Sequence, residues 1–194
     1  MLVTFRIGRE RARPRLRRVP IIEFRTLGAV DLAAADGGDL TALIRQPKRV
    51  ALLAYLLIAG RGAFVRRDKL LALFWPEVDA ERARSSLRTN LHRLRVMLGA
   101  DAIVTRGPDD VRANDALIRC DANSLRDASD SGDHEAVLSR YTGELLDGLH
   151  VLGAAAEFEQ WLDRERNELR QLAIRSGWEI VTRREQHVDH AGSA

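Results

Sequence analysis

The sequence predicts an α+β fold in which short strands come first, three helices and a hairpin follow, and the rest of the chain is helical. Three observations predict this order. Short apolar runs bounded by turn residues lie between residues 21 and 44 and are typical of strands. Between residues 47 and 98, apolar residues recur at intervals of three and four, which is the period of an α-helix. From residue 121 onward the pattern is helical throughout.

Composition bounds the class of protein. With 45% hydrophobic and 30% charged residues, the chain is typical of a soluble globular protein. Its one cysteine, Cys120, excludes an internal disulfide and favours a reducing compartment. The longest apolar run, residues 50–59, is far shorter than the roughly 20 residues that cross a membrane, and residues 1–5 are too short for a signal-peptide core. We therefore predict a cytoplasmic protein with no membrane partner.

The net charge of +3 conceals a division between two halves of the chain. Residues 1–106 hold 21 Lys and Arg against 10 Asp and Glu, whereas residues 107–194 hold 10 against 18. This asymmetry predicts a basic module for a polyanion joined to an acidic module that meets another partner. Seven arginines lie within residues 1–18. We predict a disordered basic arm there, which either adds nonspecific phosphate contacts or has no role.

Strands are predicted at the start of the ordered chain. Residues 21–28 and 29–32 alternate well enough for two short strands. The Asp-Gly-Gly-Asp sequence of residues 36–39 predicts a turn, and a further short strand is expected over residues 40–44.

Two helices are predicted next. Pro47 suits the first turn of the first helix, and Gly60 ends it. That helix is apolar nearly all round, so we expect it to be the buried one. The second helix covers residues 66–75, and Pro76 closes it.

The third helix, over residues 79–99, is amphipathic. Asp79 is its expected N-cap, and Gly99 is expected to take the left-handed position after it. Its inner face carries Ala83, Leu87, Leu91, Leu94 and Leu98. Its outer face is basic and polar, which fits either a solvated surface or contact with nucleic acid.

A hairpin is predicted after the third helix. Residues 102–106 and 111–120 suggest strands, and the Gly-Pro-Asp-Asp sequence of residues 107–110 suggests the turn between them. Strands, three helices and a terminal hairpin are the order of a winged helix-turn-helix, with N-terminal β-strands and a C-terminal wing hairpin. In that motif the third helix enters the major groove of DNA.

The last third of the chain is predicted to be all-α. Short helices are expected over residues 123–128 and 134–141, and an irregular connection over residues 145–153. A long helix is expected over residues 155–187, with Gly177 as a point where it breaks in two. Because a lone helix cannot bury an apolar face, we expect further helices or a second chain to complete this module.

Three stretches together resemble a known family: QPKRVALLAYLLIAGRG, VRRDKLLALFWPEVDAERARSSLRTNLHRLRVMLG and IVTRGPDDVRA. They are similar to the winged-helix domain of the SARP family of bacterial transcriptional activators. HEAVLSRYTGELLDGL and EFEQWLDRERNELRQLA resemble the start of the bacterial transcriptional activator domain, which is built of tetratricopeptide-like helices. The resemblance implies four parts. These are a basic arm (1–19), a winged-helix DNA-binding domain (20–119), a truncated helical activator domain (120–187) and a tail (188–194).

The resemblance also implies roles for matching side chains. Those expected toward base edges are Arg88, Thr89 and Arg93. Those expected toward phosphates are Ser85, Asn90, His92 and Arg95. The wing is expected to contribute Arg106 and Arg112, although two acidic residues, Asp109 and Asp110, stand where the family commonly has Gly-Tyr. The implied partners are double-stranded DNA, RNA polymerase and a second copy of the chain on DNA, and the implied function is that of a sequence-specific transcriptional activator.

Other functions find less support. The sequence contains no phosphate-binding GxxxxGK loop and no G-x-S-x-G elbow, so we predict no enzyme and no cofactor. His187 and His190 are spaced as metal ligands, but they lack further ligands nearby, and we predict no metal site. The acidic residues of the long helix are expected to form a solvated or partner-facing surface: Glu157, Glu159, Asp163, Glu165 and Glu168. The main alternative keeps the fold but gives the basic face a protein partner in the transcription machinery.

Overall fold

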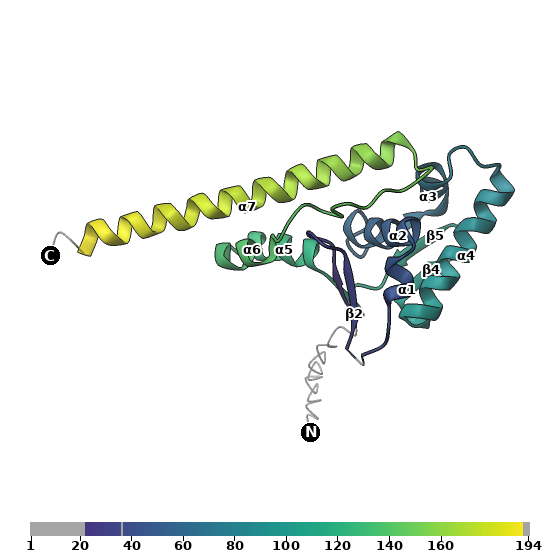
Figure 1. Ribbon diagram of the computed structural model, residues 1–194, viewed down its shortest axis with the longest axis horizontal. Helices are drawn as coiled ribbons and strands as arrows, with labels where there is room; N and C mark the ends of the chain where they lie inside the picture. Colours follow the sequence, from purple (N-terminus) through teal and green to yellow (C-terminus); the bar gives the residue numbers. More distant parts are fainter. Residues whose placement is uncertain (1–21, 36, 192–194) are drawn as a thin grey trace, which may run out of the picture.

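A computed structural model describes residues 22–35 and 37–191, with side chains described up to residue 186. The predicted basic arm of residues 1–19 and the side chains of His187 and His190 lie outside this range. The chain combines helices with two small sheets, so the mixed α+β class is confirmed (Figure 1). Within the described range, no helix is both long enough and apolar enough to cross a membrane.

The first sheet joins the start of the ordered chain to its middle. It contains, in spatial order, β2 (Asp31–Ala34), β1 (Ile22–Arg25) and β6 (Ile118–Cys120). The β1–β2 pair is antiparallel, whereas β6 lies parallel to β1.

The second sheet is the hairpin with one added strand. Its spatial order is β3 (Val65–Arg66), β5 (Asp110–Ala113) and β4 (Ile103–Arg106), all antiparallel. The predicted hairpin forms, but its second strand is shorter than residues 111–120. A turn in which the Leu117 and Ile118 N–H groups both donate to the Asn114 carbonyl ends the pairing, and the chain then crosses to the first sheet.

Residues 40–44 were expected to form a strand and instead form one helical turn, α1 (Thr41–Ile44). The Asp39 carboxylate accepts the Thr41 N–H at 2.8 Å, and the Leu43 N–H donates to the Leu40 carbonyl at 2.9 Å. These local acceptors satisfy the backbone without a neighbouring strand, because an Asp side chain competes with sheet hydrogen bonding in this way.

The core is built around the predicted buried helix, α2 (Pro47–Ile58), with Pro47 in its first turn. Every residue of α2 from Val50 to Ile58 is buried. Helix α3 (Arg67–Phe74) packs beside it. An aromatic cluster joins both helices to the C-terminal helix: its members are Tyr55, Phe74, Trp75, Phe158 and Trp161.

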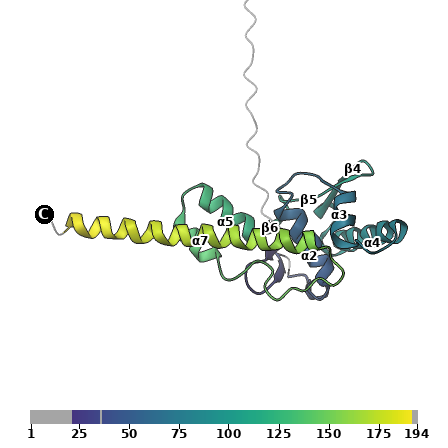
Figure 2. The ribbon, with the colours of Figure 1, turned by 90° about the horizontal axis from the view of Figure 1, so that it is seen from above.

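The C-terminal part is all-α, as predicted. It contains α5 (Asp121–Asp130), α6 (His134–Arg140) and α7 (Ala156–Ala191). The expected break at Gly177 is wrong, because α7 runs through it without interruption. A glycine inside a helix costs only about 1 kcal/mol, which the packing of a 36-residue helix offsets. In Figures 1 and 2 the C-terminal end of α7 projects beyond α5 and α6.

One expected surface group is not on the surface. The Glu165 side chain is 16% exposed and forms an ion pair with Arg126 of α5, whose side chain is 7% exposed. The prediction that these acidic residues form a solvated or partner-facing surface is therefore wrong at Glu165. The reason is that α5 and α7 pack together and bury this pair between them.

Candidate nucleic-acid interface

Helix α4 (Ala80–Leu98) lies at the end of the molecule remote from the projecting end of α7 (Figures 1 and 2). Its N-cap is Asp79, whose carboxylate accepts the Arg82 N–H at 3.0 Å, as predicted. The five apolar residues predicted for the inner face are all buried. Gly99 follows the helix with φ 101° and ψ 150°, so it has a positive φ but not the left-handed helical conformation expected of it.

The outer face of α4 is exposed to solvent. Exposed side chains on it are Ser85, Arg88, Thr89, His92 and Arg93. No ion pair involves Arg88 or Arg93 within the described residues, whereas Arg82 pairs with Asp79 at 3.3 Å. Two guanidinium groups without an acidic partner, separated by short polar side chains, leave a surface that can donate hydrogen bonds to an incoming anion.

Arg95 occupies a different environment from the other predicted site residues. It is half-buried, and its Nε donates to the Ile103 carbonyl at 2.9 Å. This hydrogen bond ties the last turn of α4 to the first residue of β4. Arg95 therefore holds the helix against the hairpin, and only its terminal amino groups are available for a phosphate.

The two hairpin arginines lie together against Phe64. The guanidinium carbon of Arg106 is 4.4 Å from the ring centroid of Phe64, and that of Arg112 is 5.3 Å away. Arg106 also forms an ion pair with Asp110 at 2.8 Å, while Arg112 donates to the Gly62 carbonyl at 3.3 Å. Both predicted wing residues are thus already engaged within the protein.

Arg49, which the sequence pattern did not single out, lies against the flank of α4. Its Nε donates to the Asn90 Oδ1 at 3.2 Å, and the Asn90 amide nitrogen donates to the Ser86 carbonyl at 2.9 Å. Partial burial lowers the pKa of Arg49, and the charge of Arg93 lowers it further. The signal in the sequence was a basic residue in the first turn of an otherwise apolar helix, but its contact with Asn90 spans 41 positions.

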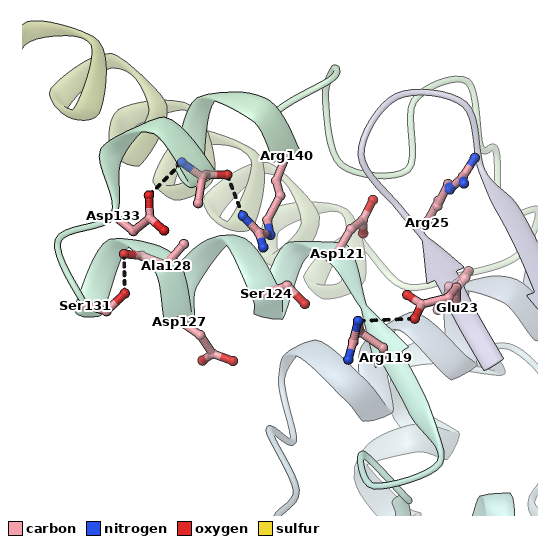
Figure 3. A pocket seen from close by; sticks show the side chains of 12 residues that line it. Glu23, Arg25, Arg119, Asp121, Ser124, Asp127, Ala128, Ser131, Asp133 and Arg140 are labelled. Carbon is pink, nitrogen blue, oxygen red and sulfur yellow. Dashed lines mark hydrogen bonds and ion pairs between the residues drawn. The ribbon is translucent and has the colours of Figure 1, made fainter. Parts of the chain in front are cut away.

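A separate hollow of about 590 Å³ lies between the first sheet and helices α5 and α6 (Figure 3). Its charged side chains are engaged with the protein itself. Arg119 pairs with Glu23 at 3.4 Å, and Asp133 accepts the Ala136 N–H as the N-cap of α6. Arg140 donates to the Ala136 carbonyl at 2.8 Å. This arrangement contains no nucleophile paired with a base, and its polar groups account for local structure.

Elsewhere in the described part of the chain, the one cysteine is not set up as a reactive group. Cys120 is buried, and burial, together with the nearby Asp121 carboxylate, raises the pKa of its thiol from 9.0 to about 11. The thiol is therefore uncharged and shielded at neutral pH. Among the described residues, no group of three or more His, Cys, Asp or Glu is arranged to hold a metal ion.

Comparison with known structures shows a likeness of fold. No protein-family model matches the chain, and no curated protein matches it. Its structure is similar to that of EmbR from Mycobacterium tuberculosis, solved in complex with a low-affinity phosphopeptide. The TM-score is 0.54 at 23% sequence identity, over 81% of this chain and 44% of that chain. The chain thus spans less than half the length of EmbR, and the likeness is one of fold.

Proposed function

We propose that this chain is a sequence-specific, DNA-binding transcriptional regulator of the SARP type, and that it acts as an activator. The observation that carries the proposal is the outer face of α4, which is basic and exposed, and on which Arg88 and Arg93 have no acidic partner in the described part of the chain. The likeness of fold to EmbR, a SARP-family transcriptional regulator, supports the same assignment. So does the resemblance of the sequence motifs to that family.

In this proposal, α2, α3, α4 and the β4–β5 hairpin form a winged helix-turn-helix. Helix α4 enters the major groove, where Arg88, Thr89 and Arg93 contact base edges. Arginine can bond two acceptors of one guanine at once, and this geometry discriminates bases by about 1–3 kcal/mol per contact. Ser85 and His92 lie on the same exposed face and are proposed to fix the register on phosphates, together with the free part of Arg95.

The helical module supplies the second half of the function. Helices α5, α6 and α7 together hold 12 Asp and Glu against 8 Arg, and the first turns of α7 pack against α3. We propose that this module contacts RNA polymerase or a second copy of the chain bound to an adjacent site. Two linked winged helices would bind more tightly than one, because the second binds at a high effective concentration.

The proposal is tested by selecting bound sites from a random duplex library at two salt concentrations. Enrichment of a repeated motif that persists at the higher salt is expected. Arg93→Ala should then weaken binding to the selected site by roughly 1–3 kcal/mol and relax the preference at one base position. Arg175→Ala, an exposed arginine on the outer part of α7, is the matched control and should leave the selected motif unchanged.

The opposite outcome favours the assembly alternative. Binding without any motif, which collapses steeply with salt, would mean that α4 presents a basic face without reading bases. In that case the basic face is better explained as a surface for an acidic protein of the transcription machinery.

A further inference from the structure

We propose that Arg49 binds one phosphate of the DNA backbone, and that Asn90 sets the position of that phosphate relative to the base-reading face of α4. This inference rests on the proposed function and adds a contact from α2, the first helix of the proposed winged helix-turn-helix. Neither the sequence motifs nor the comparisons assign a role to Arg49.

Arg49 differs from its neighbour Lys48 in how its donors are used. The Lys48 ammonium donates to the carbonyls of Phe74 at 2.8 Å and Gly153 at 3.5 Å, so it holds the fold together. Arg49 has five N–H donors, and the described part of the chain supplies one acceptor, the Asn90 Oδ1. No carboxylate there forms an ion pair with it. Its remaining donors are available for an acceptor that is not part of the protein.

The two arginines repel each other in the free protein. Arg49 is half-buried; burial is the larger cause of its lowered pKa, and the charge of Arg93 is the smaller one. An anion that bonds to Arg49 offsets this repulsion, and a phosphate has the charge and the acceptor oxygens to do so.

The position of Arg49 matches a helix in the major groove. At about 100° per residue, Ser86, Asn90 and Arg93 lie on one flank of α4. Arg88 and Arg95 lie on the opposite flank. A helix is about as wide as the major groove, so its two flanks face the two phosphate strands. Arg49 extends the Asn90 flank toward one of these strands.

Asn90 connects this contact to the recognition helix. Its amide is fixed by the Ser86 carbonyl of the preceding turn, and its Oδ1 fixes the Arg49 Nε. A phosphate bound by the free amino groups of Arg49 therefore has a set distance from Thr89 and Arg93. Positioning of this kind affects all sequences alike, because phosphates carry no base identity.

The test measures duplex affinity against salt concentration for the full chain, on the selected site and on a scrambled duplex. Arg49→Gln is expected to weaken both duplexes about tenfold at low salt and to reduce the salt slope by about one. Arg49→Lys keeps the charge but lacks the Nε–H donor, so it should keep the slope and lose affinity only a few-fold. Arg175→Gln is the charge-matched control and should leave the slope unchanged.

Asn90 is tested by a double-mutant cycle. Asn90→Ala should weaken wild-type binding a few-fold on both duplexes but have little further effect in the Arg49→Gln background, because the two act as a unit. Thermal unfolding of each variant shows whether the fold is intact. If Arg49→Gln disturbs the fold, Arg49→Lys still tests the proposal. Because lysine keeps the positive charge, a salt slope reduced by about one in Arg49→Lys would overturn the role given to that charge.

The failure of this inference is distinct from failure of the proposed function. If Arg49→Gln binds both duplexes with the affinity and slope of the wild type while Arg93→Ala loses base preference, the phosphate site is wrong and the regulator stands. If the wild type shows no base preference and no variant of the α4 face alters binding, the proposed function falls, and the phosphate site falls with it.

Discussion

Arg106 and Asp110 face each other across the β4–β5 pair, and both the Nε and the Nη2 of Arg106 donate to one Asp110 oxygen, at 3.1 and 2.8 Å. The Asp110 side chain is 24% exposed and that of Arg106 is 67% exposed. The hairpin thus carries its own counterion where a DNA-binding wing needs a free cation. This pair accounts for one of the two acidic residues at the turn: Asp110 neutralises the arginine that the proposed wing would present.

The first prediction concerns release of that arginine. Asp110→Asn should raise affinity for any duplex several-fold and steepen its salt slope by about one, because a guanidinium group becomes available for phosphate. Asp109→Asn removes the same charge from the same turn, but Asp109 forms no ion pair with Arg106. The comparison of the two variants by fluorescence anisotropy separates the release of Arg106 from the change in net charge. Equal effects of both variants would show that only net charge matters.

The second prediction concerns the brace between α4 and the hairpin. Arg95→Gln should lower the free energy of unfolding by about 1 kcal/mol, because the hydrogen bond to the Ile103 carbonyl is lost. Arg88→Gln, at an exposed position of the same helix, should leave stability unchanged within about 0.5 kcal/mol. Urea unfolding followed by circular dichroism measures both. Identical stabilities would assign Arg95 to the DNA surface alone.

The third prediction follows from the buried thiol. The pKa of the Cys120 thiol is about 11 in the folded chain, against an ordinary value of 9.0. As pH rises, the thiol therefore ionises in the unfolded chain before it ionises in the folded chain. The contribution of the buried Cys120 thiol to the free energy of unfolding is therefore constant below about pH 9 and falls between pH 9 and 11. The loss is roughly 1.4 kcal/mol for each unit of pKa difference.

The variant Cys120→Ala isolates this effect from other groups that titrate at high pH. The difference in unfolding free energy between wild type and variant should shrink from pH 8 to pH 10.5. In addition, the wild-type thiol should react with a thiol reagent only as the chain unfolds. A constant difference across this range, or rapid modification at pH 8, would contradict burial as the cause.

Local patterns in the sequence predicted the parts of the fold that depend on near neighbours. The buried apolar face of α4 follows from its helical spacing. The Asp79 cap depends on a contact with the Arg82 N–H, only three residues away. The strand expected over residues 40–44 failed for a local reason, the Asp39 side chain, whereas the end of the hairpin strand is decided by distant residues. The parallel pairing of β6 with β1 brings together segments about a hundred residues apart, and nothing in either segment specifies its partner.

The candidate site divides in the same way. The exposed positions of α4 follow from its periodicity, so Arg88, Thr89 and Arg93 were predicted as a group. What each arginine touches depends on tertiary contacts: the sequence does not show that Arg95 reaches Ile103 or that Arg49 reaches Asn90. Helical periodicity and charge therefore identified the outer face of α4 as the candidate surface. The tertiary contacts of each arginine distinguish those that are free to bind from those that hold the structure.

The last prediction concerns the ion pair buried between α5 and α7. Arg126 bonds to Glu165 through Nη2 and to Glu168 through Nε at 3.4 Å, while its Nη1 is buried without an acceptor among the described residues. Arg126→Met should destabilise the chain by about 3 kcal/mol, because it leaves the Glu165 carboxylate buried without its partner. Adding Glu165→Met should recover most of that loss, since two apolar side chains of similar volume then pack at the same place. The sum of the two single effects should thus exceed the effect of the double variant by 1 kcal/mol or more in urea unfolding. Additive effects would mean that the pair contributes no coupling and that α7 is held against α5 by its apolar contacts alone.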